Sequence, residues 1–191
     1  MYFFNNLIYD GKNSQIYEAI NKESDKKVIA KITKRKKEER VIKEILALKT
    51  IKNNISNTAQ LLDFGLTSSN SYKHLLVIIK KIFENFGDQN LKEFISSKNE
   101  YKKNDIKLII KSLLTIVNNL HKEGLIHRDI KPSNIIISSE TKEIRLIDFG
   151  ITSFYIPNQE INPKLGTFYF KSPEQLLNFK KCFSGLQMLE K

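Results

Sequence analysis

The sequence predicts an α+β fold with two lobes: a small antiparallel five-stranded lobe with one helix, then a mainly helical lobe. Two observations support this division. The first part of the chain alternates short apolar runs with polar turn residues, which is typical of paired strands. The second part contains a long stretch in which apolar residues recur every three or four positions, which is typical of an amphipathic helix.

The first lobe is expected to span residues 1–82. Its five strands are expected at residues 3–9, 15–20, 28–32, 61–64 and 75–79. A helix is expected at 40–51, where apolar residues follow helical spacing. The residues on the buried side of this helix are expected to be Val41, Ile45, Leu48 and Ile51.

The second lobe is expected to span residues 83–191 and to be built around a helix at 105–122. Asn104 is expected to cap the start of this helix, and Gly124 is expected to end it. The apolar side of the helix is expected to consist of Ile106, Ile109, Ile110, Leu113, Ile116, Val117 and Leu120. The hinge between the lobes is expected near 79–87, where the irregular sequence permits no firm alignment.

Composition limits the class of protein and its partners. The net charge is +11, but only four of the 32 basic residues are arginine, and lysine, isoleucine and asparagine are all abundant. This excess resembles an AT-rich coding bias, and no nucleic-acid-binding motif accompanies it, so nucleic acid is not an expected partner. The single cysteine, Cys182, excludes an intramolecular disulfide framework. No secretory signal or membrane-length apolar run is visible, so a cytoplasmic or nuclear protein without membrane contact is expected.

Two short motifs carry the chemistry. The first is His-Arg-Asp-Ile-Lys-Pro-Ser-Asn at 127–134, and the second is Asp-Phe-Gly at 148–150. A small hairpin of strands at 135–137 and 144–147 is expected to hold them together. Phosphoryl transfer needs an acceptor for the proton of the attacking hydroxyl and oxygen ligands for the metal that neutralises the phosphates.

Asp129 can accept the proton, and Asn134 and Asp148 can hold the metal. Lys131 can reach the transferred phosphoryl group as a point charge. In wording and order the two motifs resemble those of the eukaryotic protein kinase family. The resemblance implies a two-lobed protein-kinase-like fold over residues 1–191, with ATP and Mg²⁺ as cofactors and proteins as substrates.

The same resemblance assigns residues in the first lobe. Lys31 ends the string Val-Ile-Ala-Lys and corresponds to the strand lysine that holds the α- and β-phosphates. Its partner is expected to be a glutamate on the following helix. Glu44 fits the family pattern best, with Glu38 and Glu39 as alternatives that also suit exposed charges at a helix start.

The glycine-rich loop that covers the phosphates is the least complete motif. Of its three glycines only the second is kept, as Gly11, while Tyr9 and Ser14 stand in the other two places. Ile16 corresponds to the valine of the motif. Gly11 taken alone is also an ordinary hairpin glycine, but Ile16 lies 15 residues before Lys31, as the valine of the family motif does, which favours the phosphate-covering role.

The activation segment is expected at 148–174. Thr167 is expected to hydrogen-bond Asp129 and Lys131, as in Ser/Thr kinases of the family. His127 is expected to be a packed structural residue. Arg128 is expected either to pair with a phosphorylated residue of this segment or to hold it without phosphorylation.

The strings Gly-Lys-Asn-Ser at 11–14, Arg-Leu-Ile-Asp at 145–148 and Tyr-Phe-Lys at 169–171 narrow the resemblance further. Among the kinases, the sequence from residue 9 to residue 183 most resembles the catalytic alpha subunit of casein kinase II. That resemblance implies phosphorylation of Ser/Thr in acidic sequences, use of ATP or GTP, and a regulatory subunit. The basic run 34–37 is in the position of a lysine cluster that reads substrates, although a solvated helix start explains it equally well. Phe149 departs from the pattern, because casein kinase II has tryptophan there.

The large lobe is expected to be incomplete, truncated after the activation segment. Kinase domains continue through several more helices beyond a Ser-Pro-Glu stretch such as 172–174, and the stretch 183–189 resembles a degraded start of the next one. The alternative function is therefore a catalytically impaired pseudokinase or nucleotide-binding scaffold. The full set of polar motif residues favours the enzyme.

Overall fold

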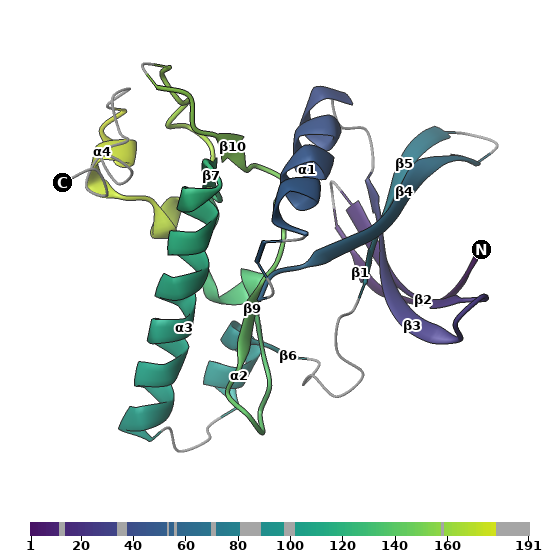
Figure 1. Cartoon of the computed structure of the whole chain (residues 1–191), viewed down its shortest axis with the longest axis horizontal. Coiled ribbons are helices and arrows are strands. Elements are labelled where there is room, and N and C mark those ends of the chain that lie inside the picture. Colours follow the sequence, from purple (N-terminus) through teal and green to yellow (C-terminus); the bar gives the residue numbers. More distant parts are fainter. Residues whose placement is uncertain are drawn as a thin grey trace. The chain divides into compact units, whose positions relative to one another are not determined.

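The computed structural model describes residues 1–11, 14–33, 38–52, 54–55, 57–69, 72–80, 89–97, 102–157 and 159–178. The chain forms two compact units, Met1–Phe86 and Gly87–Lys191, which are described separately (Figure 1). Three sequence features lie outside the described residues: the basic run 34–37, most of the hinge at 81–88, and the stretch 183–189.

The first unit contains a five-stranded antiparallel sheet, as the sequence predicts. Its strands are β1 (Tyr2–Asp10), β2 (Ser14–Asn21), β3 (Lys26–Thr33), β4 (Gln60–Ser69) and β5 (Tyr72–Lys80). They follow the order β1-β2-β3-β5-β4. All five are longer than predicted, because polar residues at their ends continue the ladder of backbone hydrogen bonds.

Helix α1 (Glu38–Ile51) contacts β4 through its apolar face (Figure 1). The four residues predicted for its buried side are all buried: Val41, Ile45, Leu48 and Ile51. Leu48 and Ile51 have no exposed surface. Burial of this stripe removes apolar area from water and fixes the rotation of α1 about its axis, which places Glu44 toward the interior.

The second unit begins with two elements that the sequence analysis did not predict. Strand β6 (Gln89–Asn90) leads directly into α2 (Leu91–Ser96). Asn90 caps this helix by accepting from the Glu93 amide at 3.0 Å, and the Glu93 carboxylate accepts from the Asn90 amide at 3.0 Å. This reciprocal capping box makes a helix of fewer than two turns regular.

Helix α3 (Lys103–Lys122) begins earlier than predicted, and Asn104 is not its cap. Lys102 has the extended backbone of an N-cap residue and its side chain makes no capping bond, so Asn104 lies inside the first turn. The prediction for the other end is confirmed. Gly124 has φ +67°, a left-handed conformation suited to glycine, and its amide donates to the His121 carbonyl at 2.9 Å.

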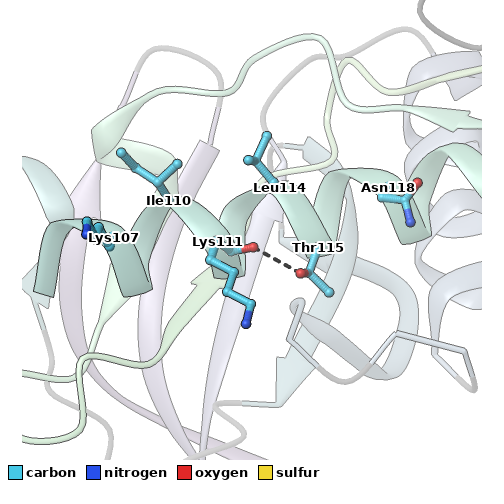
Figure 2. A pocket seen from close by; sticks show the side chains of 6 residues that line it. All are labelled: Lys107, Ile110, Lys111, Leu114, Thr115 and Asn118. Atoms are coloured by element: carbon cyan, nitrogen blue, oxygen red, sulfur yellow. Dashed lines mark hydrogen bonds between the residues drawn. The ribbon is translucent and has the colours of Figure 1, made fainter. Parts of the chain in front are cut away.

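The predicted apolar side of α3 is only partly buried. Ile116 and Leu120 are buried, whereas Ile106 and Ile110 are about half exposed, at 48% and 52%. An open hollow of about 470 Å³ lies on the exposed side, and Figure 2 shows its lining side chains on this one helix. They are Lys107, Ile110, Lys111, Leu114, Thr115 and Asn118. None of them is a predicted site residue.

A three-stranded sheet in the order β6-β8-β9 carries the motif residues of the second unit. Strands β8 (Ile135–Ile137) and β9 (Ile144–Leu146) form the predicted hairpin, and α3 contacts β9. The remaining elements are short: β7 (Leu125–Ile126), which pairs with β10 (Ser153–Phe154), the 3₁₀ turns η1 (Pro132–Asn134) and η2 (Phe168–Phe170), and α4 (Pro173–Leu176). In the described part of the chain, no helix is long and apolar enough to cross a membrane.

Candidate active site

Lys31 on β3 and Glu44 on α1 form a buried ion pair. Lys31 Nζ lies 2.6 Å from Glu44 Oε1, and the side chains are 9% and 1% exposed. Burying either charge alone would be costly, and the contact between the two offsets part of that cost. Among the described residues Glu44 Oε2 has no hydrogen-bond partner. Glu44 is the partner that the sequence predicts for Lys31, and the structure contains this pair. The side chains of the alternatives, Glu38 and Glu39, lie outside the described part.

Ile16 lies beside this ion pair on the sheet. It is the direct partner of Lys31 in the β2–β3 register, so both side chains point to the same face. Ser14 begins β2, and its carbonyl accepts from the Gly11 amide at 2.9 Å, which closes the turn between β1 and β2. A Cβ on Gly11 would lie 2.4 Å from the Tyr9 ring, so the Tyr9 side chain occupies the space beside this glycine.

Asp129 is the centre of a hydrogen-bond network in the second unit. Its Oδ1 accepts from the Thr167 hydroxyl at 2.6 Å and from the Thr167 amide at 3.1 Å. Its Oδ2 lies 2.7 Å from Lys131 Nζ and 3.0 Å from Asn134 Nδ2. Lys131 Nζ also donates to the Thr167 hydroxyl at 2.9 Å. The hydrogen bonds expected of Thr167 are therefore present.

These contacts set the charge of Asp129. Burial by itself would raise the pKa of the carboxyl group, but hydrogen bonds from Lys131, Thr167 and Asn134 together with the Lys131 charge outweigh burial and lower that pKa. The side chain is therefore an anionic acceptor at neutral pH, fixed in direction by four donors. A group of this kind can orient a hydroxyl and receive its proton as the bond to phosphorus forms.

Asn134 and Asp148 are brought together by the β8–β9 hairpin. The Ile147 amide donates to the Asn134 carbonyl at 2.9 Å, which joins the ends of the two motifs. Both amide hydrogens of Asn134 are used on Asp129, so Oδ1 is the atom that it can offer to a metal. Asp148 has φ +64°, a conformation that costs a non-glycine residue energy and occurs often at functional sites. An amide oxygen and a carboxylate fit Mg²⁺, which prefers oxygen ligands.

His127 is a buried structural residue, as expected. Its Nε2 lies 3.1 Å from the Ile147 carbonyl, and its Nδ1 accepts from the Asp129 amide at 3.2 Å. These roles place the single ring proton on Nε2. The ring also packs edge-on against Phe149, with centroids 4.9 Å apart. His127 therefore links the two motifs, and burial lowers its pKa so that the neutral form is favoured.

The lowered pKa of His127 predicts a loss of stability in mild acid. Below about pH 6.5 the unfolded chain takes up a proton that the folded chain resists, so the free energy of unfolding falls as pH falls toward the folded-state pKa. Thermal unfolding midpoints measured from about pH 7.5 to about pH 5.5 should fall, and His127→Gln should flatten the curve. His121→Gln is the comparison variant: burial lowers the pKa of His121 as well, so this variant should remove only the share of the slope that belongs to His121. An undiminished slope in His127→Gln would contradict this assignment.

Arg128 attaches the loop at 127–134, named the catalytic loop from here on, to the segment after Asp148. Its guanidinium donates to the Ser153 hydroxyl at 2.8 Å and to the Asn162 carbonyl. The residue has φ +71°, a left-handed backbone conformation that is strained for a residue other than glycine. Of the two roles expected for Arg128, these contacts correspond to holding the segment without a phosphate.

Two contacts of this site were not foreseen. Phe149 was noted only as a departure from a motif, but its ring is 1% exposed and packs on His127. Lys171 donates to the carbonyls of Lys164 at 2.8 Å and Pro163 at 3.3 Å. The apolar character of Phe149, three residues after the largely buried strand β9, is a usable signal. For Lys171 there is none, because its partners are backbone atoms.

A family model supports the same interpretation of the whole chain. The model of the protein kinase domain matches residues 2–185, which includes both the Lys31–Glu44 pair and the Asp129 network. Because this match covers nearly all of the sequence, the chain belongs to the protein kinase family.

Proposed function

We propose that this chain is a serine/threonine protein kinase that acts on hydroxyl groups in acidic sequence contexts. Membership of the protein kinase family implies a phosphotransferase that uses ATP and a divalent metal on protein substrates. Our proposal adds three points to family membership: Ser/Thr instead of Tyr as the acceptor, Mg²⁺ as the metal, and acidic sequences as the substrates.

The observation that carries the proposal is the bridge that Thr167 makes between Asp129 and Lys131. Thr167 donates to Asp129 Oδ1 at 2.6 Å and accepts from Lys131 Nζ at 2.9 Å. A carboxylate and an ammonium are thereby held side by side. This arrangement suits a short aliphatic hydroxyl that loses its proton to the carboxylate while the ammonium stabilises charge on the transferred phosphoryl group.

The remaining site residues have supporting roles in this mechanism. Asn134 and Asp148 would hold Mg²⁺, which supplies positive charge that neutralises the phosphates. Lys31, oriented by Glu44, would hold the α- and β-phosphates of ATP. Ile16 adds an apolar surface on the same face of the sheet as Lys31, and Gly11 and Ser14 belong to the turn that would cover the phosphates.

The preference for acidic substrates rests on the resemblance to casein kinase II and on charge. The net charge of +11 favours encounter with acidic peptides in a salt-dependent way. We extend the same resemblance to GTP as an alternative phosphate donor and to a regulatory subunit as a partner.

A second function, that of a nucleotide-binding scaffold without turnover, is favoured by one observation. Tyr9 stands where the family pattern has a glycine, and its ring lies against Gly11. A bulky ring at this turn hinders the close approach of backbone amides to phosphate on which fast transfer depends.

A phosphate-transfer assay separates the two functions. With labelled ATP and Mg²⁺, the kinase should phosphorylate a Ser peptide flanked by Asp and Glu. When Thr replaces Ser in this peptide, the rate of transfer should change by less than about tenfold. When Tyr replaces Ser, transfer should stay at the background level. Asp148→Ala should abolish transfer while leaving the fold intact. Transfer by the wild-type chain no greater than by Asp148→Ala would reject the kinase and leave the scaffold.

A further inference from the structure

Two cations of this chain hold the backbone just before Gly166. Three successive carbonyl groups accept from them: that of Asn162 from Arg128, and those of Pro163 and Lys164 from Lys171 Nζ at 3.3 and 2.8 Å. Carbonyls of an exposed loop are normally satisfied by water, and hydrogen bonds to a charged donor are stronger than neutral ones. This row therefore fixes the course of the chain from 162 to 164.

Gly166 then passes tightly against the catalytic loop. It has φ +107°, and a Cβ at this position would lie 2.9 Å from the Arg128 carbonyl oxygen. The same Cβ would lie 3.8 Å from Lys171 Cε and 4.0 Å from Cγ, so the Lys171 stem lies alongside Gly166. The half-buried Lys171 side chain thus packs along the turn, with its ammonium on the carbonyls of 163 and 164.

Thr167 follows directly, and its position depends on this turn. Both its amide and its hydroxyl reach Asp129 Oδ1. Two such bonds to one oxygen require the backbone at Gly166 to hold its present conformation. Within the described part of the chain, the Lys171 ammonium contacts these two backbone carbonyls, and a role in reading acidic substrate residues would require it to leave them.

We propose that Lys171 is a positioning residue for the transfer reaction: by clamping the carbonyls of Pro163 and Lys164 it holds Thr167 on Asp129. The expected change in kcat rests on the proposed function. The effect of Lys171 on the position of Thr167 does not depend on catalysis. Losing the clamp frees the turn, releases two of the four donors that orient Asp129, and leaves the ATP-binding residues unaltered.

The test compares Lys171→Met, which keeps the stem but removes the donor, with Lys171→Arg, which keeps a donor. Lys164→Met is the matched control, because Lys164 is an exposed lysine of the same segment. Hydrogen–deuterium exchange at the Thr167 amide should accelerate in Lys171→Met and stay at the wild-type rate in Lys164→Met. In the peptide assay kcat should fall by up to about 10²-fold in Lys171→Met with KM for ATP unchanged, and Lys171→Arg should restore most of it.

Two results would overturn the inference. One is unchanged exchange at the Thr167 amide in Lys171→Met. The other is a rise in KM for the acidic peptide with kcat unchanged, which would make Lys171 a substrate-reading cation. If the wild-type chain transfers no phosphate, the proposed function fails, and the exchange measurement still decides whether Lys171 positions Thr167.

Discussion

Replacing Lys31 with methionine is expected to have the largest combined effect on activity and stability. Phosphate transfer should fall by about 10²–10³-fold, because one fixed positive charge on the phosphates is lost. The free energy of unfolding should fall as well, by up to about 3–5 kcal/mol, because Glu44 stays buried without its partner. Its side chain is only 1% exposed, so water cannot easily replace the ammonium. Initial rates and urea denaturation measure the two effects.

The double variant Lys31→Met/Glu44→Leu separates these effects. Replacing a buried ion pair with apolar residues of similar volume is often neutral or stabilising, so the double variant should regain most of the lost stability. It should not regain activity, because the phosphates still lack the ammonium. If transfer recovers together with stability, Lys31 supports the fold and does not bind the nucleotide.

The Asp129→Asn variant should lose about 10²–10⁴-fold in kcat. It should also lose some stability, because the new amide group is a donor that faces Lys131 Nζ and Asn134 Nδ2, which are donors themselves. Asparagine keeps the shape of the side chain and an oxygen that can accept from the Thr167 amide and hydroxyl. It no longer supplies an anion that can take the proton of the substrate hydroxyl. KM for ATP should stay the same, because in this mechanism Asp129 acts on the attacking hydroxyl and not on the nucleotide.

Glu140→Gln provides the control for Asp129→Asn, because it removes one negative charge at an exposed turn of the same unit. Its kinetics should equal those of the wild-type chain. The pH–rate profile of the wild-type chain tests the lowered pKa of Asp129: the rate should stay level as pH falls from 7 toward the ordinary carboxyl range and decline only below it. A decline that begins near neutral pH would assign the base role to another group.

Hydrophobic periodicity was sufficient to predict the first unit. The alternating strands and the stripe of Val41, Ile45, Leu48 and Ile51 are local patterns, and each of them is found where expected. The same kind of pattern was less reliable on α3. Periodicity indicates that Ile106 and Ile110 share a face, but it carries no information about what covers that face, and both are about half exposed.

Two other differences between the prediction and the structure concern the short helix α2 and the start of α3. Helix α2 is brief, but Asn90 and Glu93 are a capping-box signature that could have revealed it. Asn104 is a favourable cap by type, yet the extended backbone at Lys102 decides where α3 begins. Propensity alone cannot supply the direction in which a chain enters a helix.

At the candidate site, motif order predicted which residues of the second unit lie close together, and the hairpin explains why. Strands β8 and β9 bring Asn134 and Asp148 together from positions separated in sequence. The clamp formed by Lys171 could not be predicted in this way, since a lysine that binds backbone carbonyls leaves no pattern of partner residues.

Titration calorimetry with Mg²⁺ and ATP is the most direct test of the central proposal, that Asn134 and Asp148 hold the metal ion of a bound metal–nucleotide complex. The folded wild-type chain should give a saturable heat of binding that weakens when EDTA removes the metal. The heat should weaken in the same way in Asp148→Ala. A folded wild-type chain that gives no heat with Mg²⁺ and ATP would contradict the proposal.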